Sequence, residues 1–134
     1  MALPHADLLD VINVSPLGDA LVDTFSTSLI KTGSVQLLHL VLPAREDQPE
    51  HHVTHECVIH CLEGELDVVM PGGTRHLAAG RLVVLPPMQK HSLRARTDCA
   101  VMVTLLLDRG DAAHGGGAGA RSLQDEEGST PRSK

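Results

Sequence analysis

The sequence predicts an all-β protein, folded as one antiparallel sandwich or barrel, and three features support this. Between residues 25 and 107, short segments rich in Val, Leu and Ile alternate with turn residues such as Pro71-Gly72-Gly73 and Pro86-Pro87. No helical pattern of about 10–15 residues separates these segments, as it would in a βαβ protein. The length of 134 residues suits a single domain.

The expected elements follow one another closely along the chain. The one helical candidate is PHADLLDVI, at residues 4–12. Strands are expected at residues 26–30, 34–42, 57–62, 64–70, 74–78, 81–86, 91–96 and 99–107. The second and the last of these strands are almost wholly apolar, so we expect both of their faces to be covered, by another layer or by a second copy of the chain.

These elements divide the chain into three parts. Residues 1–23 form an N-terminal extension, residues 24–108 the β-barrel and residues 109–134 a C-terminal tail. The tail is rich in glycine and almost without large apolar side chains, so it cannot bury enough surface to offset the entropy of ordering it. We therefore expect the tail to be disordered.

Composition excludes several classes of partner. The chain has no Trp or Tyr, a single Phe and a net charge of -6, so it lacks both the stacking side chains and the positive charge of a nucleic-acid-binding protein. No run of about 18 apolar residues could span a membrane, and the N-terminus lacks the pattern of a secretory signal. We expect a cytoplasmic protein whose three cysteines are reduced thiols or metal ligands.

Residues 50–64 read EHHVTHECVIHCLEG, a segment with four histidines and two cysteines. If this segment is extended, alternation places His55, Cys57, Ile59 and Cys61 on one face, which we expect to line the lumen, and His52, Glu56 and His60 on the other. Imidazole and thiolate groups bind ions such as Zn, Ni, Cu and Fe. The face that carries His55 and Cys57 is therefore a candidate metal site, although a buried cysteine often only fills space.

A second segment, GRLVVLPPMQKHSLRA at residues 80–95, closely resembles the second sequence motif of the cupin family, G-x5-P-x-G-x2-H-x3-N. Gly80, Pro86 and His91 match it, whereas Met88 and Ala95 replace its second glycine and its asparagine. His91 occupies the position that supplies a metal ligand in the family.

The first cupin motif, G-x5-H-x-H-x3,4-E-x6-G, fits less well. With Gly64 as its closing glycine, His51 stands at the first histidine, Val53 at the second, Cys57 at the glutamate and Arg45 at the opening glycine. Two of the four usual ligands, His51 and His91, are therefore retained.

The resemblance implies an antiparallel double-stranded β-helix, or jelly-roll barrel, with a short N-terminal helix or extension. Cupins are commonly dimeric, so a homodimer is expected, with a small-molecule pocket near His51, Cys57 and His91. The ligand positions imply one divalent metal ion, such as Zn, Fe, Ni or Mn. The remaining ligand is open between Cys57, His55 after a shift of register, and Glu56 if a one-residue bulge turns it inward.

The cupin fold does not determine an activity, because the family includes dioxygenases, isomerases, decarboxylases, storage proteins and sensor domains. Three hypotheses follow. The first is a metal-dependent protein, dioxygenase- or isomerase-like, that acts on or binds a small metabolite. The second is a metal-free module that binds or senses a small molecule without catalysis. The third is a barrel that serves mainly to dimerise.

Overall fold

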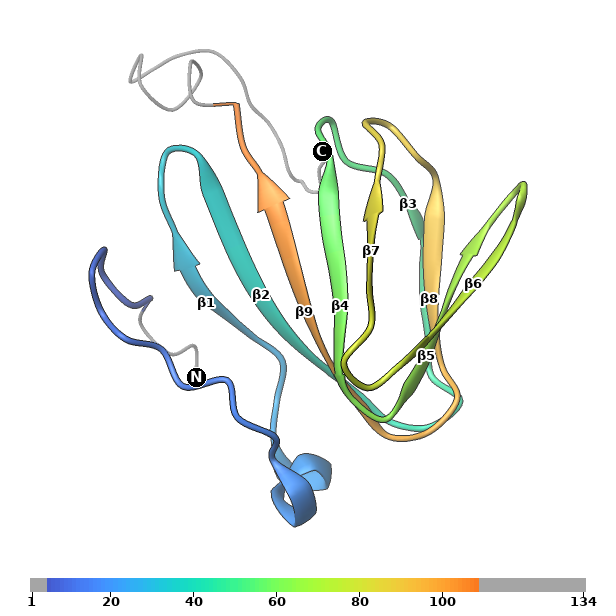
Figure 1. The fold of residues 1–134 in the computed structure, drawn as a ribbon, viewed down its shortest axis with the longest axis horizontal. Coiled ribbons are helices and arrows are strands. Elements are labelled where there is room, and N and C mark those ends of the chain that lie inside the picture. Colours follow the sequence, from blue (N-terminus) through green and yellow to red (C-terminus); the bar gives the residue numbers. More distant parts are fainter. Residues whose placement is uncertain (1–4, 109–134) are drawn as a thin grey trace.

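The computed structural model describes residues 5–108, and these form two antiparallel β-sheets that face each other (Figure 1). The strands are β1 (Thr27–Lys31), β2 (Val35–Leu42), β3 (Asp47–His51), β4 (Cys57–Glu63), β5 (Glu65–Met70), β6 (Gly73–Ala78), β7 (Leu82–Leu85), β8 (His91–Ala95) and β9 (Cys99–Leu106). The larger sheet has the order β1-β2-β9-β4-β7 and the smaller has the order β3-β8-β5-β6. This arrangement confirms the all-β jelly-roll fold expected from the sequence.

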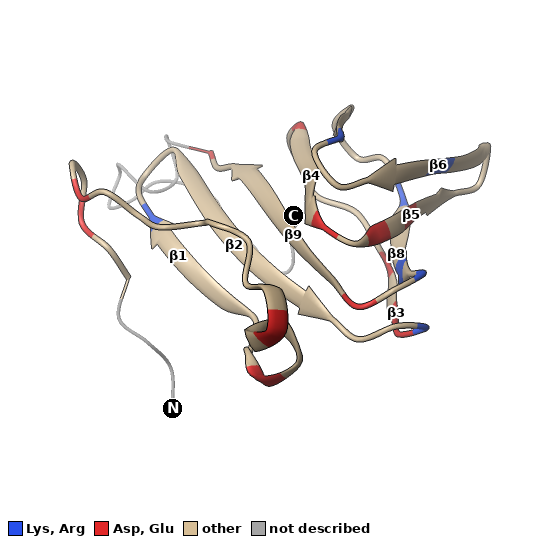
Figure 2. Ribbon diagram, turned by 60° about the horizontal axis from the view of Figure 1, so that its bottom comes forward, with Lys and Arg blue, Asp and Glu red and all other residues tan. Residues whose placement is uncertain are grey.

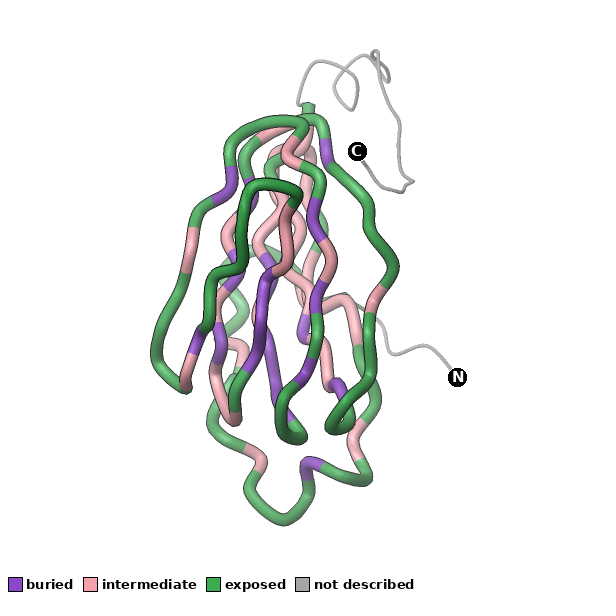
Figure 3. Tube along the Cα trace, turned by 90° about the vertical axis from the view of Figure 1, so that its right-hand side faces the viewer, coloured by how far each residue is buried: buried purple, intermediate pink, exposed green. Residues whose placement is uncertain are grey.

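The hydrophobic core lies between the two sheets, where the buried segments of the chain face each other (Figure 3). Strict alternation places Cys57, Ile59 and Cys61 of β4 in the core, as the sequence predicted. From β9, Cys99 and Val101 are fully buried beside them. The core therefore contains all three cysteines of the chain, none of them in a disulfide, and no aromatic side chain.

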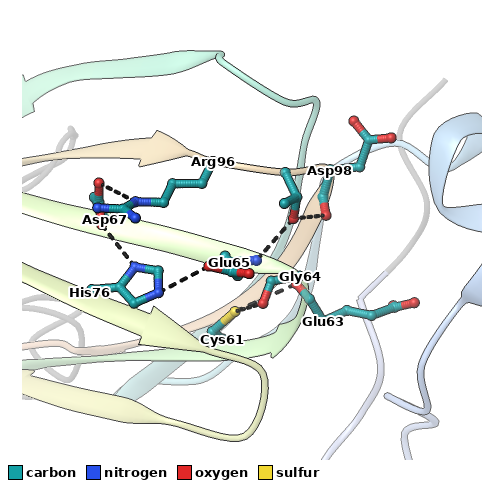
Figure 4. Close-up of polar contacts among 9 residues, drawn as sticks. Cys61, Glu63, Gly64, Glu65, Asp67, His76, Arg96 and Asp98 are labelled. Carbon is teal, nitrogen blue, oxygen red and sulfur yellow. Dashed lines mark hydrogen bonds and ion pairs between the residues drawn. The ribbon is translucent and has the colours of Figure 1, made fainter.

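The turn from β4 to β5 depends on a glycine. Gly64 has φ of +82°, and a Cβ atom at this position would collide with the carbonyl oxygen of Asp98 and lie 2.8 Å from the Cβ of Cys99. The Cys61 thiol donates to the carbonyl oxygens of Glu63 and Gly64, at 3.5 and 3.4 Å (Figure 4). Only glycine meets both the backbone conformation and the close approach of the β8–β9 connection.

All eight expected strands are present, and the structure adds a ninth, β3, which the sequence did not indicate. Its sequence, DQPEH, is polar and contains Pro49. A proline is tolerated because β3 is an edge strand that pairs only with β8. A short edge strand needs no apolar alternation, and its formation depends on the neighbouring strand.

The prediction of a helix at residues 4–12 was wrong for the residues that the structure describes, because residues 5–12 contain no helix. A short 3-10 helix, η1 (Gly18–Asp23), follows instead. Leu8, Leu9 and Val11 are 71, 100 and 98% exposed, so no sheet face packs against this segment. Helices in proteins depend mainly on such packing, and the local pattern alone was not enough.

The N-terminal extension is attached to the larger sheet at two points. The backbone N–H of Ala6 donates to the Leu29 carbonyl of β1 at 2.9 Å. The backbone N–H groups of Leu17 and Gly18 both donate to the Glu63 carboxylate at 2.8 Å. These hydrogen bonds join the extension to β1 and to the end of β4, and the covering layer expected over β2 and β9 stays a prediction. The tail expected at residues 109–134 lies outside the described residues. Within residues 5–108 no helix has the length and apolar character required to cross a membrane.

Candidate functional site at the barrel mouth

Two of the predicted site residues meet where β3 ends and β8 begins. His51 and His91 are direct cross-strand partners in this antiparallel pair, and their ring centres lie 4.5 Å apart at an interplanar angle of 53°. His91 is buried, with 3% of its surface exposed, whereas His51 is exposed. The edge strand β3 therefore determines the pairing, which explains why sequence spacing alone did not establish it.

Each of the two rings is oriented by a backbone carbonyl two residues earlier in the chain. Nδ1 of His91 lies 2.9 Å from the carbonyl oxygen of Gln89, and Nδ1 of His51 lies 3.2 Å from that of Pro49. A carbonyl oxygen only accepts hydrogen bonds, so both Nδ1 atoms carry the proton. In the neutral ring the lone pair is then on Nε2, which is the arrangement found in metal-binding histidines.

His91 is held in its neutral form. Burial, together with the smaller effect of the nearby His51 and His52, lowers the pKa of its imidazole from the ordinary 6.5 to about 4, although the hydrogen bond to Gln89 opposes this effect. At neutral pH the ring is therefore uncharged, with a lone pair available to an ion or a hydrogen-bond donor. His52, interpreted from the sequence as a residue on the opposite face, is close enough to influence this site.

The other predicted ligands do not join this pair. Cys57 is the first residue of β4, 1% exposed and directed into the core. Glu56 is exposed and precedes the strand, and the only register shift of β4 lies between Cys61 and Glu63, so no bulge turns Glu56 inward. His55 lies in the loop before β4, where its Nε2 atom is buried without a hydrogen-bond partner.

Within residues 5–108, no group of three or more His, Cys, Asp or Glu side chains is arranged to hold a metal ion. The structure therefore brings together His51 and His91, and leaves His55 in the loop between β3 and β4 with an unsatisfied nitrogen. The buried Nε2 atom of His55 is the feature that sequence reasoning could not reveal, because it depends on how the loop folds.

Comparison with known proteins agrees with this architecture. A sequence model described as the cupin domain matches residues 38–107, which is more than half of the chain. The chain belongs to the cupin family. The matched segment of this cupin begins within β2 and ends after β9, so it includes both histidines of the mouth.

Solved structures resemble this cupin in fold. A cupin superfamily protein from Desulfitobacterium hafniense is 17% identical, with a TM-score of 0.64, over 77% of this chain and 100% of that chain. A conserved protein of unknown function from Streptococcus pyogenes is 14% identical, with a TM-score of 0.62, over 81 and 96% of the two chains. An RmlC-like cupin from Desulfovibrio desulfuricans is 23% identical, with a TM-score of 0.57, over 78 and 96%. No curated protein is similar enough in sequence to be matched to this chain.

The ring separation of the His51–His91 pair can be compared with that of two ligands of one ion. With a metal–nitrogen bond of about 2.1 Å, each ring centre lies roughly 3.2 Å from the ion, so two rings are about 4.5 Å apart at the right angle of octahedral coordination and about 5.2 Å apart at the tetrahedral angle. The observed ring separation is 4.5 Å. The pair therefore matches two neighbouring ligands of an octahedral ion in ring separation.

Proposed function

We propose that this cupin binds one divalent metal ion at the barrel mouth and presents it to a small oxygenated metabolite. The observation that carries the proposal is the orientation of His51 and His91, whose Nδ1 atoms are both engaged by backbone carbonyls at a ring separation of 4.5 Å. Imidazole is a good ligand for Zn, Fe and Ni, and Mn also accepts it together with oxygen ligands.

We propose His55 as the third protein ligand. Its buried Nε2 atom has no hydrogen-bond partner within the described residues, and a buried polar atom left in this state costs about 1–3 kcal/mol. His55 lies in the loop between β3 and β4, so it can move without breaking a strand. Cys57 is less suited, because it is packed in the core at the start of β4.

The bound ion would act as a Lewis acid that polarises a carbonyl or activates water or oxygen. The chain contributes the orientation of its ligands. Gln89 and Pro49 hold the two Nδ1 protons, which keeps the rings of His91 and His51 from rotating. The low pKa of His91 keeps this ligand deprotonated well below neutral pH, so protons compete weakly with the metal.

A second candidate is a metal-free cupin that binds a small molecule directly. The observation in its favour is that no three potential ligands converge within residues 5–108. In this case the neutral His91 and the exposed His51 would bind polar groups of the ligand through hydrogen bonds.

Metal content distinguishes these candidates. Untagged protein would be purified, incubated with Zn, Fe, Ni or Mn, desalted and subjected to elemental analysis, alongside the His51→Ala, His91→Ala and His55→Ala variants. The matched control is His60→Ala, because His60 lies on the opposite face of β4, away from the mouth. Each variant is also checked for folding by circular dichroism.

We expect close to one ion per chain in the wild type and the control. The affinity should fall at least about tenfold in the His51 and His91 variants, since even residues that only support a ligand change it by about 10–100-fold. An equal loss in His55→Ala would establish the third ligand. Wild-type protein that takes up no ion from any of the four metals would refute the metal site and favour the metal-free candidate.

A further inference from the structure

A pocket of about 350 Å³ lies at the end of the barrel opposite the histidine pair, between η1 and the connection from β2 to β3. It is lined by Leu21, Val22, Thr24, Phe25, Ser26, Val41, Leu42, Pro43, Glu46 and Asp98. Asp98 follows the end of β8, whereas His91 begins it, so the length of this strand, about 15 Å, separates the pocket from the mouth.

The base and the rim of the pocket are apolar. Leu21 and Leu42 form buried parts of its wall, with 7 and 2% of their surfaces exposed. Phe25 and Val22 are 83 and 70% exposed, although both are large apolar side chains. Phe25 is also the single aromatic residue of the chain. This volume and the exposed apolar rim formed by Phe25 and Val22 suit the hydrocarbon part of a small ligand.

Two carboxylates stand on the same wall without a cationic partner. One oxygen of Asp98 accepts the backbone N–H of Ala44 at 2.8 Å, and one oxygen of Glu46 accepts the side-chain amide of Gln48 at 3.2 Å. The ion pairs within residues 5–108 involve other acids, namely Glu65, Asp67 and Asp47.

Arg45 lies beside Glu46 on the connection from β2 to β3, but it forms no ion pair with Glu46 or Asp98 within the described residues. Figure 4 shows the Asp98 carboxylate turned away from Asp67 and its cationic partners. Figure 2 shows further acidic residues on η1, at the same end of the barrel. Charge complementarity therefore favours a cationic occupant.

We propose that this pocket binds a small organic ammonium ion, a primary amine attached to a hydrocarbon group. The ammonium group donates hydrogen bonds to the second oxygens of Glu46 and Asp98, and the hydrocarbon packs against Phe25 and Leu42. This site goes beyond the proposed function of the barrel mouth and does not depend on it, because the two share no residue.

The test uses the full-length 15N-labelled protein and three probes of the same length, namely hexylamine, hexan-1-ol and hexanoate. Amide chemical shifts would be followed during titration at neutral pH. For a ligand of this size we expect a dissociation constant in the millimolar range for hexylamine. Hexanol should bind at least about tenfold more weakly, and hexanoate should not bind.

Matched variants separate the role of the two carboxylate charges from that of the apolar rim. The Glu46→Gln/Asp98→Asn double variant keeps an acceptor for the Ala44 N–H and should weaken hexylamine binding at least about tenfold. Phe25→Ala removes an exposed side chain, so it should fold normally and weaken binding about fivefold. Glu50→Gln, an exposed carboxylate on β3, is the control and should bind like the wild type.

Three results would each overturn the proposal. Equal affinity for hexylamine and hexanol would make the pocket an apolar groove without charge selectivity. No shift at ten times the expected dissociation constant would exclude this ligand class. Shifts that depend on protein concentration, and not on the amine, would mean that a side chain of a second copy fills the pocket.

Discussion

Replacing Gly64 with alanine tests the close approach between the β4–β5 turn and the β8–β9 connection. A Cβ atom at this position would overlap the backbone carbonyl of Asp98 and lie 2.8 Å from the side chains of Thr97 and Cys99. The positive φ of +82° adds a conformational cost of about 1–2 kcal/mol, and forcing a methyl group into packed surroundings costs about 1–3 kcal/mol. Together these costs amount to about 2–5 kcal/mol, and from the middle of this range we expect Gly64→Ala to lose about 3–4 kcal/mol of stability.

Gly80→Ala is the matched control, because Gly80 has φ of +87° and nothing within 4 Å of its added Cβ. Its conformational cost is partly offset by the lower entropy of the unfolded chain, so the net loss should be at most about 1 kcal/mol. The difference between the two variants measures the steric clash alone.

Urea unfolding followed by far-UV circular dichroism is the appropriate assay, because the chain has no Trp or Tyr for fluorescence. With a slope of about 2 kcal/mol per molar urea, the midpoint should fall by about 1.5–2 M in Gly64→Ala and by at most about 0.5 M in the control. Midpoints within about 0.5 M of each other would refute the clash.

Four further predictions concern buried groups and assembly. Because the His91 pKa falls from 6.5 to about 4 on folding, the unfolded chain takes up this proton first, so metal-free protein should lose about 3 kcal/mol of stability as the pH falls from 6.5 to 4. His91→Gln should flatten this dependence in urea unfolding, and an unchanged slope would contradict it. Burial favours a raised pKa for Asp67, but hydrogen bonds from Arg96 and His76 outweigh it and hold this pKa below its ordinary value. Arg96→Met should therefore lower the free energy of unfolding by about 1–2 kcal/mol, against about 0–1 kcal/mol for Arg94→Met, which breaks an exposed pair. The fully buried thiols of β4 and β9, one with a pKa raised by burial to about 12, should react with a thiol reagent only after unfolding, and rapid labelling of native protein would contradict this. The homodimer expected from the sequence stays a prediction, which sedimentation at micromolar concentration would test by showing a mass of two chains or one.

The strands that could be predicted are those with a clear apolar pattern. The alternation of Cys57, Ile59 and Cys61 in β4 predicted correctly which face is buried. The polar edge strand β3 (Asp47–His51) has no such pattern, and the helix expected near the N-terminus has no sheet face to support it. Local patterns predict an element when its own side chains supply the burial, and fail when a neighbouring element decides.

The candidate site shows the same division. The motif resemblance pointed to His51 and His91, and the structure places their rings 4.5 Å apart. The same reasoning considered His55, Cys57 and Glu56 as further ligands, but their positions depend on a loop and on the start of β4. Spacing along the chain cannot determine the direction of a loop side chain.

The fold class, the cupin resemblance and the inward face of β4 could be predicted from the sequence alone, because burial patterns and motif spacings are local properties of the chain. The pairing of β3 with β8, the unpartnered nitrogen of His55 and the acid-lined pocket beside η1 became visible only in the folded molecule. Each of these depends on residues far apart in sequence, for example Glu46 and Asp98, that meet only when the sheets have packed. The physical reason is that cross-strand register and loop packing minimise the free energy of the whole molecule and not that of any one segment.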